Sequence, residues 1–230
     1  MLYPNDNGPF YAETDLGRFP VEPWNTYSLV TFGIVAMFWA HKNRLNLRQH
    51  PSLVTCVILI TIGTVGGARY HACRCNFWWL IADVLPIGAV VTIGALLFWK
   101  QLRAKSARCF NLTLSSCISL LVLNVLLKDY YPKQMWITLM YVNLSLVLLT
   151  PSFVISYLDC WRHLKLLTYS SVAIVIALIF RVLDFQPGII KIFPMGTHFL
   201  WHCFGAFSGY FLMKYIYERG RDQQPFLSDL

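Results

Sequence analysis

The sequence predicts an all-α fold, a polytopic membrane protein built as a bundle of seven transmembrane helices. The first observation behind this prediction is composition, since 57% of the 230 residues are hydrophobic and only 13% are charged. Such a balance excludes an ordinary soluble domain. The second is a set of seven apolar segments, each near the ~20 residues that a helix needs to cross ~30 Å of hydrocarbon. The third is that short connections join these segments and leave no length for a separate soluble domain.

The expected membrane segments follow one another along most of the chain. They are Trp24–Ala40, Leu53–Tyr70, Phe77–Trp99, Cys109–Leu127, Met135–Tyr157, Leu164–Leu183 and Gly196–Tyr217. Tryptophans lie near several segment ends, where amphipathic rings prefer the headgroup level. We expect three regions: an extracytosolic N-terminal tail (1–23), a seven-helix domain (24–217) and a cytosolic C-terminal tail (218–230). The start of the chain lacks the features of a cleavable signal, so the first helix is expected to direct insertion.

The distribution of Lys and Arg predicts the orientation, because positively charged loops stay in the cytosol. With the N-terminus outside, twelve of the nineteen basic residues fall on the inner side: Lys42, Arg44, Arg48, Lys100, Arg103, Lys105, Arg108, Arg162, Lys165, Lys214, Arg219 and Arg221. The whole excess of eight positive charges is then cytosolic. The basic residues are divided among short loops, which argues against a nucleic-acid partner. Nothing indicates an obligate protein partner.

Two histidines at the start of the last segment are the most informative residues. His198 and His202 lie four residues apart, so on a helix their side chains come within about 6 Å and can reach one metal ion. His71 and Asp83 lie at a similar depth, because consecutive helices alternate in direction. Ionisable groups inside a membrane are costly and indicate a partner or a function. Three imidazoles with an open fourth position are typical of catalytic zinc, and Asp83 could accept a proton from the bound water or orient it.

Two other interpretations of the polar residues stay open at this point. The membrane histidines could simply be bonded to carbonyls or neighbouring helices, as we expect for the histidines of the inner loops: His41, His50 and His163. Cys73 and Cys75 follow His71 directly and could form a soft metal site, although nothing nearby completes a Cys-rich shell. The seven cysteines are otherwise found mostly within apolar segments, so they do not indicate a disulfide framework.

The N-terminal tail carries a second polar group. Glu13, Asp15 and Glu22 offer carboxylates, and Asn25 adds an amide oxygen. Hard oxygen ligands of this kind suit Ca²⁺. The alternative is a solvated acidic tail, with Glu22 as an interfacial charge or a cap near the first helix.

Taken together, these residues resemble the alkaline ceramidase family and its bacterial members. That family lies within a superfamily of seven-helix zinc hydrolases that also includes adiponectin-receptor-like proteins and Per1 lipid-remodelling proteins. Four blocks carry the resemblance: Glu13 with Glu22-Pro-Trp-Asn25-Thr, then Gly67-Ala-Arg-Tyr-His71-Ala, then Asp83, and finally His198-x-x-x-His202. The resemblance covers most of the chain and depends on the order and spacing of the four blocks.

The resemblance implies a site and an activity. It implies that zinc is held by His71, His198 and His202, that Asp83 serves the bound water, and that a regulatory calcium is held by Glu13, Asp15 and Glu22. The implied activity is hydrolysis of the N-acyl amide of ceramide or a ceramide-like membrane lipid, which gives a fatty acid and a long-chain base. The expected cofactors are therefore Zn²⁺ and, at the tail, Ca²⁺.

The chain departs from the family pattern at two places. Gly67 stands where the family usually has a serine close to the zinc-bound water, and Thr64, on the same helix face as His71, could supply that hydroxyl instead. Phe10 stands where the family's calcium block carries an aspartate. Two rival functions therefore remain: a seven-helix receptor or scaffold with structural zinc, and a zinc hydrolase of another lipid ester or amide.

Overall fold

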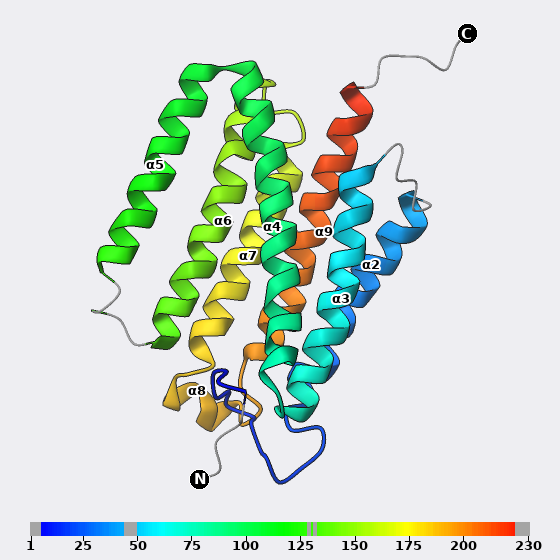
Figure 1. Ribbon diagram of the computed structural model, residues 1–230, viewed down its shortest axis with the longest axis vertical. Helices are drawn as coiled ribbons and strands as arrows, with labels where there is room; N and C mark the ends of the chain where they lie inside the picture. The colour runs from blue at the N-terminus through cyan, green and yellow to red at the C-terminus, as the bar shows by residue number, and fades with distance from the viewer. Residues whose placement is uncertain (1–5, 44–49, 128–129, 131–132, 224–230) are drawn as a thin grey trace.

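The computed structural model describes residues 6–43, 50–127, 130 and 133–223, and no strand occurs among them. The helices are α1 (Pro23–Ser28), α2 (Val30–Asn43), α3 (Pro51–Cys73), α4 (Phe77–Lys105), α5 (Ala107–Leu126), α6 (Lys133–Leu158), α7 (Leu164–Leu183), α8 (Pro187–Ile192) and α9 (His198–Gln223). The long helices run alongside one another in a single bundle, with α8 and the N-terminal segment at one end (Figure 1). The prediction of an all-α bundle is confirmed.

Among the described residues, five helices are long and apolar enough to cross a membrane: α3, α4, α5, residues Met135–Leu158 of α6, and α7. The other two expected segments are occupied by α2 and α9. The first segment is interrupted at Leu29, which caps α1, and α2 keeps only 14 residues. Helix α9 has 26 residues, but its histidines, glycines and tyrosines lower its hydropathy. The hydropathy of the five spans makes the chain an integral, multi-pass membrane protein.

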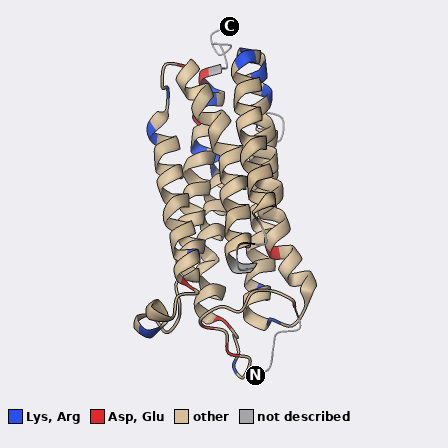
Figure 2. Cartoon of the chain, turned by 90° about the vertical axis from the view of Figure 1, so that its left-hand side faces the viewer, with Lys and Arg blue, Asp and Glu red and all other residues tan. Residues whose placement is uncertain are grey.

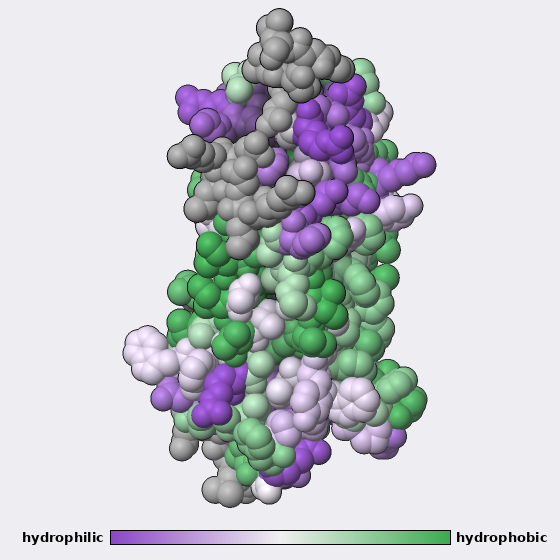
Figure 3. Space-filling model, turned by 90° about the vertical axis from the view of Figure 1, so that its right-hand side faces the viewer, coloured by the Kyte–Doolittle hydropathy of each residue, from purple (hydrophilic) through white to green (hydrophobic). Residues whose placement is uncertain are grey.

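The surface of the bundle is divided into an apolar middle and polar ends. Figure 3 shows the apolar band between two more hydrophilic zones. Large apolar side chains are exposed on the long helices, among them Leu85 and Leu96 of α4 and Leu126 of α5. Lipid tails would cover such side chains, as expected for a membrane-spanning bundle.

Lys and Arg residues gather at the end of the bundle where α9 ends (Figure 2). There the ion pairs of Lys105 and Arg219 with Asp159 connect the ends of α4, α6 and α9. The helices alternate in direction as expected, so α3 ends and α9 begins at the opposite end of the bundle (Figure 1).

Helix α9 lies between two clusters of buried apolar side chains. One cluster joins α9 to α2 and α3 through residues such as Trp39, Val57 and Met213. The other joins α9 to α4, α6 and α7 and includes Leu102 and Tyr215. Because α9 is packed on both sides, the two histidines in its first turns are held in fixed positions.

Helices α3 and α4 approach each other closely through small residues. A Cβ added at Gly66 would lie 2.6 Å from the carbonyl oxygen of Ala82, which leaves no room for a side chain. Small residues allow this kind of close backbone contact between membrane helices. The contact holds the last turns of α3, which carry His71, against the first turns of α4, which carry Asp83.

We expect Gly66→Ala to destabilise the bundle by about 1–3 kcal/mol, the usual cost of overpacking a close contact. Thermal unfolding in detergent, followed by circular dichroism, measures the change. Gly88→Ala is the matched control, because Gly88 lies on α4 with nothing within 4 Å of an added Cβ. Equal stability of the two variants would contradict the close packing of α3 on α4.

Candidate metal centre

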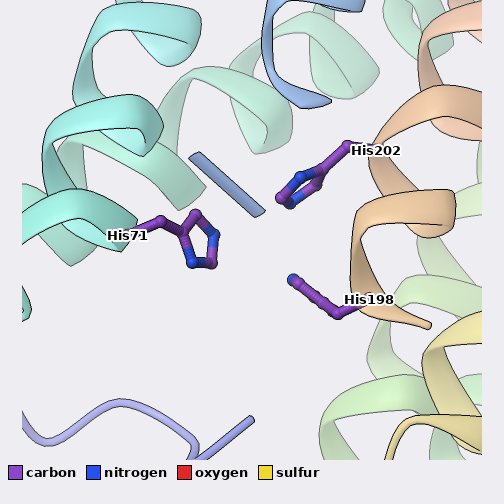
Figure 4. Close-up of side chains that lie close together, drawn as sticks. All are labelled: His71, His198 and His202. Carbon is purple, nitrogen blue, oxygen red and sulfur yellow. The ribbon is translucent and has the colours of Figure 1, made fainter. Parts of the chain in front are cut away.

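Three histidines from two helices converge in the interior of the bundle. His71 comes from the last turn of α3, and His198 and His202 come from the first turns of α9. One ligand nitrogen from each ring lies within 4.8 Å of the others, and the three side chains point toward a common space (Figure 4). All three are buried. No other group of three His, Cys, Asp or Glu side chains in the described part of the chain is arranged to hold a metal ion.

The ring nitrogens of the triad are available in the way that a metal requires. Nδ1 of His71 is hydrogen-bonded to Oε2 of Glu22 at 2.5 Å, and Nε2 of His71 is buried without a partner. Nδ1 of His202 lies 2.8 Å from Oγ of Ser28, while Nδ1 of His198 is buried and unpartnered. A carboxylate on one ring nitrogen orients the other toward a metal. Because buried polar atoms without partners are costly, the triad fits a bound ion.

Glu22 connects the triad to a buried ionic chain. The guanidinium of Arg74 contacts Oε1 of Glu22 and donates from Nε to Oδ2 of Asp6 at 2.6 Å. Burial opposes a charge on Glu22, but the hydrogen bonds from His71 and Thr14 and the positive charge of Arg74 outweigh it and hold the pKa of Glu22 below its usual value. Sequence reasoning missed Asp6 and Arg74, although Arg74 follows His71 by only three residues.

The first turn of α9 is held by a carboxylate from the end of α7. Oδ1 of Asp184 accepts hydrogen bonds from the backbone N–H groups of Thr197, at 2.7 Å, and His198, at 2.9 Å. Gly196, with a φ of +70°, makes room for this contact, since an added Cβ would lie 2.2 Å from Oδ1 of Asp184. A carboxylate that caps a helix start stabilises it and fixes its direction. Asp184 therefore positions His198, a role that the sequence did not reveal.

Each residue of the predicted calcium group makes a contact within the protein. Glu13 accepts hydrogen bonds from the backbone N–H groups of Trp24, at 3.0 Å, and Asn25, at 2.6 Å. Burial raises the pKa of Glu13 against the effect of these two bonds. Asp15 is exposed and accepts from the N–H of Gly17, while Oδ1 of Asn25 is buried without a partner. The calcium site stays a prediction, and Glu22 is already engaged by His71 and Arg74.

Asp83 lies beside the triad, on the wall of a cavity of about 890 Å³. His198, His202 and Thr64 line the same cavity. Nearly half of its remaining lining residues are Leu, Ile or Val, most of them from helices across the bundle. A cavity of this size with a few converging polar groups is typical of a site for a small molecule or a lipid chain.

Gly67 packs directly against Asp83. A Cβ at Gly67 would lie 2.4 Å from Oδ1 of Asp83, so a serine at this position would displace the carboxyl group. The hydroxyl of Thr64 donates to the carbonyl of Ile60 at 2.8 Å, which leaves only its oxygen lone pairs directed to the cavity. In this chain, the space next to Gly67 is therefore filled by Asp83 itself.

The fold and the site together define the class of this protein: a helical membrane protein with a buried triad of histidines that can hold a metal ion. Comparison of the chain with protein-family models, with curated proteins and with solved structures finds no match. Any finer assignment must therefore come from the chemistry of the site.

We expect Glu22→Gln to weaken zinc binding about 10–100-fold, the usual effect of losing the carboxylate that orients a histidine ligand. The amide keeps the shape of the side chain but removes the charge that faces His71 and Arg74. Competition with a chelator measures the affinity. Glu218→Gln is the matched control, because Glu218 pairs with the exposed Arg221 at the other end of α9. Similar zinc affinity in both variants would remove Glu22 from the metal centre.

Proposed function

We propose that this protein is a zinc-dependent membrane amidase that hydrolyses the N-acyl amide of ceramide or a ceramide-like lipid. The observation that carries the proposal is the convergence of His71, His198 and His202, together with a largely apolar cavity that is lined by two of these histidines and by Asp83. The resemblance of the same residues to the alkaline ceramidases supports the choice of substrate. The products would be a fatty acid and a long-chain base.

The three imidazoles would hold the ion. A histidine-only ligand set suits Zn²⁺ and leaves a coordination position open. When bound in such a site, zinc polarises a carbonyl and lowers the pKa of its water to ~7.

The side chains of the cavity account for the remaining requirements of the reaction. Asp83 accepts the proton of the attacking water and can return it to the leaving amine nitrogen, as a general base and then a general acid. The Leu, Ile and Val side chains of the cavity wall hold the acyl chain. Since the triad lies near one end of the bundle (Figure 1), water needs to reach only that end.

The test is release of fatty acid by the purified protein, loaded with one equivalent of zinc, from a panel of ceramides, other N-acyl lipids and glycerolipids. Hydrolysis of ceramides above the glycerolipids would support the proposal. Hydrolysis of glycerolipid esters alone would assign a different bond. Stoichiometric zinc without release from any lipid would favour a receptor or scaffold whose zinc is structural.

We further propose that the C-terminus lies in the cytosol and the metal centre on the extracytosolic side. Lys and Arg residues gather where α9 ends (Figure 2), the end of the bundle opposite the start of α9 with its histidines, and positive charge stays on the cytosolic side. A reporter that is active only in the cytosol should therefore work when fused to the C-terminus and fail when fused to the N-terminus. The reverse pattern would place the metal centre on the cytosolic side.

A further inference from the structure

A buried arginine lies on the wall of the cavity close to the metal centre. Arg181 belongs to the last turn of α7, is only 4% exposed and lines the same cavity as Asp83 and the two histidines of α9. None of the ion pairs among the described residues includes Arg181. Its Nε is buried without a hydrogen-bond partner.

Two aromatic rings hold the guanidinium in place. Its centre lies 4.7 Å from the ring of Tyr141 and 5.4 Å from the ring of Trp201. Such contacts attract the positive charge through the faces of the rings, but they do not use the N–H donors at the edge of the guanidinium. An arginine inside a membrane protein is costly and normally faces a partner or a pathway for a substrate. The charge of Arg181 acts on Asp83 of the same cavity, but its buried Nε has no partner within the described residues and is free for a ligand.

The arrangement of the N–H donors on the guanidinium of Arg181 limits the chemistry of the ligand that can bind there. A guanidinium stacked on aromatic rings presents two parallel N–H groups, which match the two oxygens of a carboxylate. Beyond Arg181 the cavity wall continues as apolar side chains, including Ile174 and Leu212. A long-chain acyl lipid with a carboxylate head matches both parts of this cavity.

We propose that Arg181 is the anion-binding residue of the cavity and holds the carboxylate of a long-chain acyl lipid. The proposal rests on the proposed function, since it places the acyl chain in the same cavity. Two lipids present this group: the fatty acid released by hydrolysis, and an N-acyl amino acid, whose carboxylate is adjacent to the scissile amide. Ceramide has no anionic group and would leave the donors of Arg181 unpaired during binding.

The first experiment measures binding to the zinc-loaded protein in detergent with two ligands that cannot be hydrolysed, palmitate and hexadecanol. We expect Arg181→Gln to weaken palmitate binding about 10–100-fold, the loss typical of a hydrogen bond to a charged group, and to leave hexadecanol binding unchanged. Arg69→Gln is the matched control, because Arg69 also lies over a tryptophan ring, that of Trp79, but is exposed and outside the cavity.

The second experiment identifies the source of the carboxylate. It compares kcat/KM for N-palmitoylglycine and N-palmitoylethanolamine, which share the acyl amide but differ in head-group charge. A preference for N-palmitoylglycine that disappears in Arg181→Gln identifies an N-acyl amino acid. Arg181-dependent binding of palmitate without such a preference identifies the released fatty acid.

Several outcomes would overturn the role of Arg181. Unchanged palmitate binding in an Arg181→Gln protein with normal zinc content would do so, and so would equal binding of palmitate and hexadecanol by the parent. If Arg181→Gln fails to fold, two other measurements replace it: the ratio of palmitate to hexadecanol affinity in the parent, and palmitate binding by Arg181→Lys, which keeps the charge. A ratio of one in the parent overturns the proposal. If no lipid is hydrolysed, the proposed function is overturned. The role of Arg181 is still tested in that case, because palmitate binding does not depend on hydrolysis.

Discussion

Replacing His71, His198 or His202 with Ala is expected to remove zinc from the protein. Each variant leaves two imidazoles in a buried space where three now converge, and two nitrogens do not make a zinc site of the kind seen in proteins. The loss of affinity should exceed the ~10–100-fold expected when only an outer partner of a ligand is removed. Elemental analysis of protein purified with one equivalent of zinc gives the metal content directly.

His41→Ala is the matched control for these variants, because His41 is an exposed histidine in the last turn of α2. It should retain the zinc content of the parent. Undiminished zinc in all three triad variants would show that the ion, if bound, lies elsewhere. Loss of zinc from only one of the three would mean that the histidines do not act as one ligand set.

The second large effect is expected for Asp83→Asn, which should lower lipid amide hydrolysis by a factor of about 10²–10⁴ while zinc content stays near that of the parent. Asp83 lies on the cavity wall with His198 and His202 but is not one of the three converging ligands. The amide occupies the same volume beside Gly67 and cannot accept the proton. Fatty acid release and zinc content measured on the same preparation separate the two effects.

Asp159→Asn is the matched control for Asp83, since Asp159 forms ion pairs with Lys105 and Arg219 at the opposite end of the bundle. Its substitution should leave hydrolysis within a few-fold of the parent. Full turnover by a zinc-loaded Asp83→Asn protein would remove this carboxyl group from the reaction and leave proton transfer to solvent.

Much of the fold could be predicted from the sequence, because hydropathy over about 20 residues reports directly on burial in a bilayer. This reasoning placed α3 through α7 close to their observed positions. It placed the first membrane segment as one continuous helix, whereas the chain forms α1 and α2 with a break at Leu29. It also gave no sign of α8, a single short helix between two membrane segments. Short helices and breaks depend on local capping and tertiary contacts, which average hydropathy does not report.

The metal centre, too, could be predicted only in part from the sequence. His198 and His202 are four residues apart on one helix, so helical periodicity alone places them on one face. The depth of His71 followed from the alternation of helix directions. The convergence of the three rings depended on which helices are neighbours, and that was decided by packing: small residues bring α3 onto α4, and α9 lies between two apolar clusters.

The sequence by itself determined that this is an all-α membrane protein and which histidines could meet at one end of it. Only the tertiary structure decided the partners of those histidines, because the partners are distant in the chain: Glu22 reaches His71 across 49 residues, and Asp184 holds the backbone of His198 from another helix. The tertiary structure also decided the contacts of Arg181, because the rings of Tyr141 and Trp201 that hold its guanidinium come from two other helices. Periodicity reports which face of a helix a residue occupies, whereas the side chain that it meets is set by the packing of one helix against another.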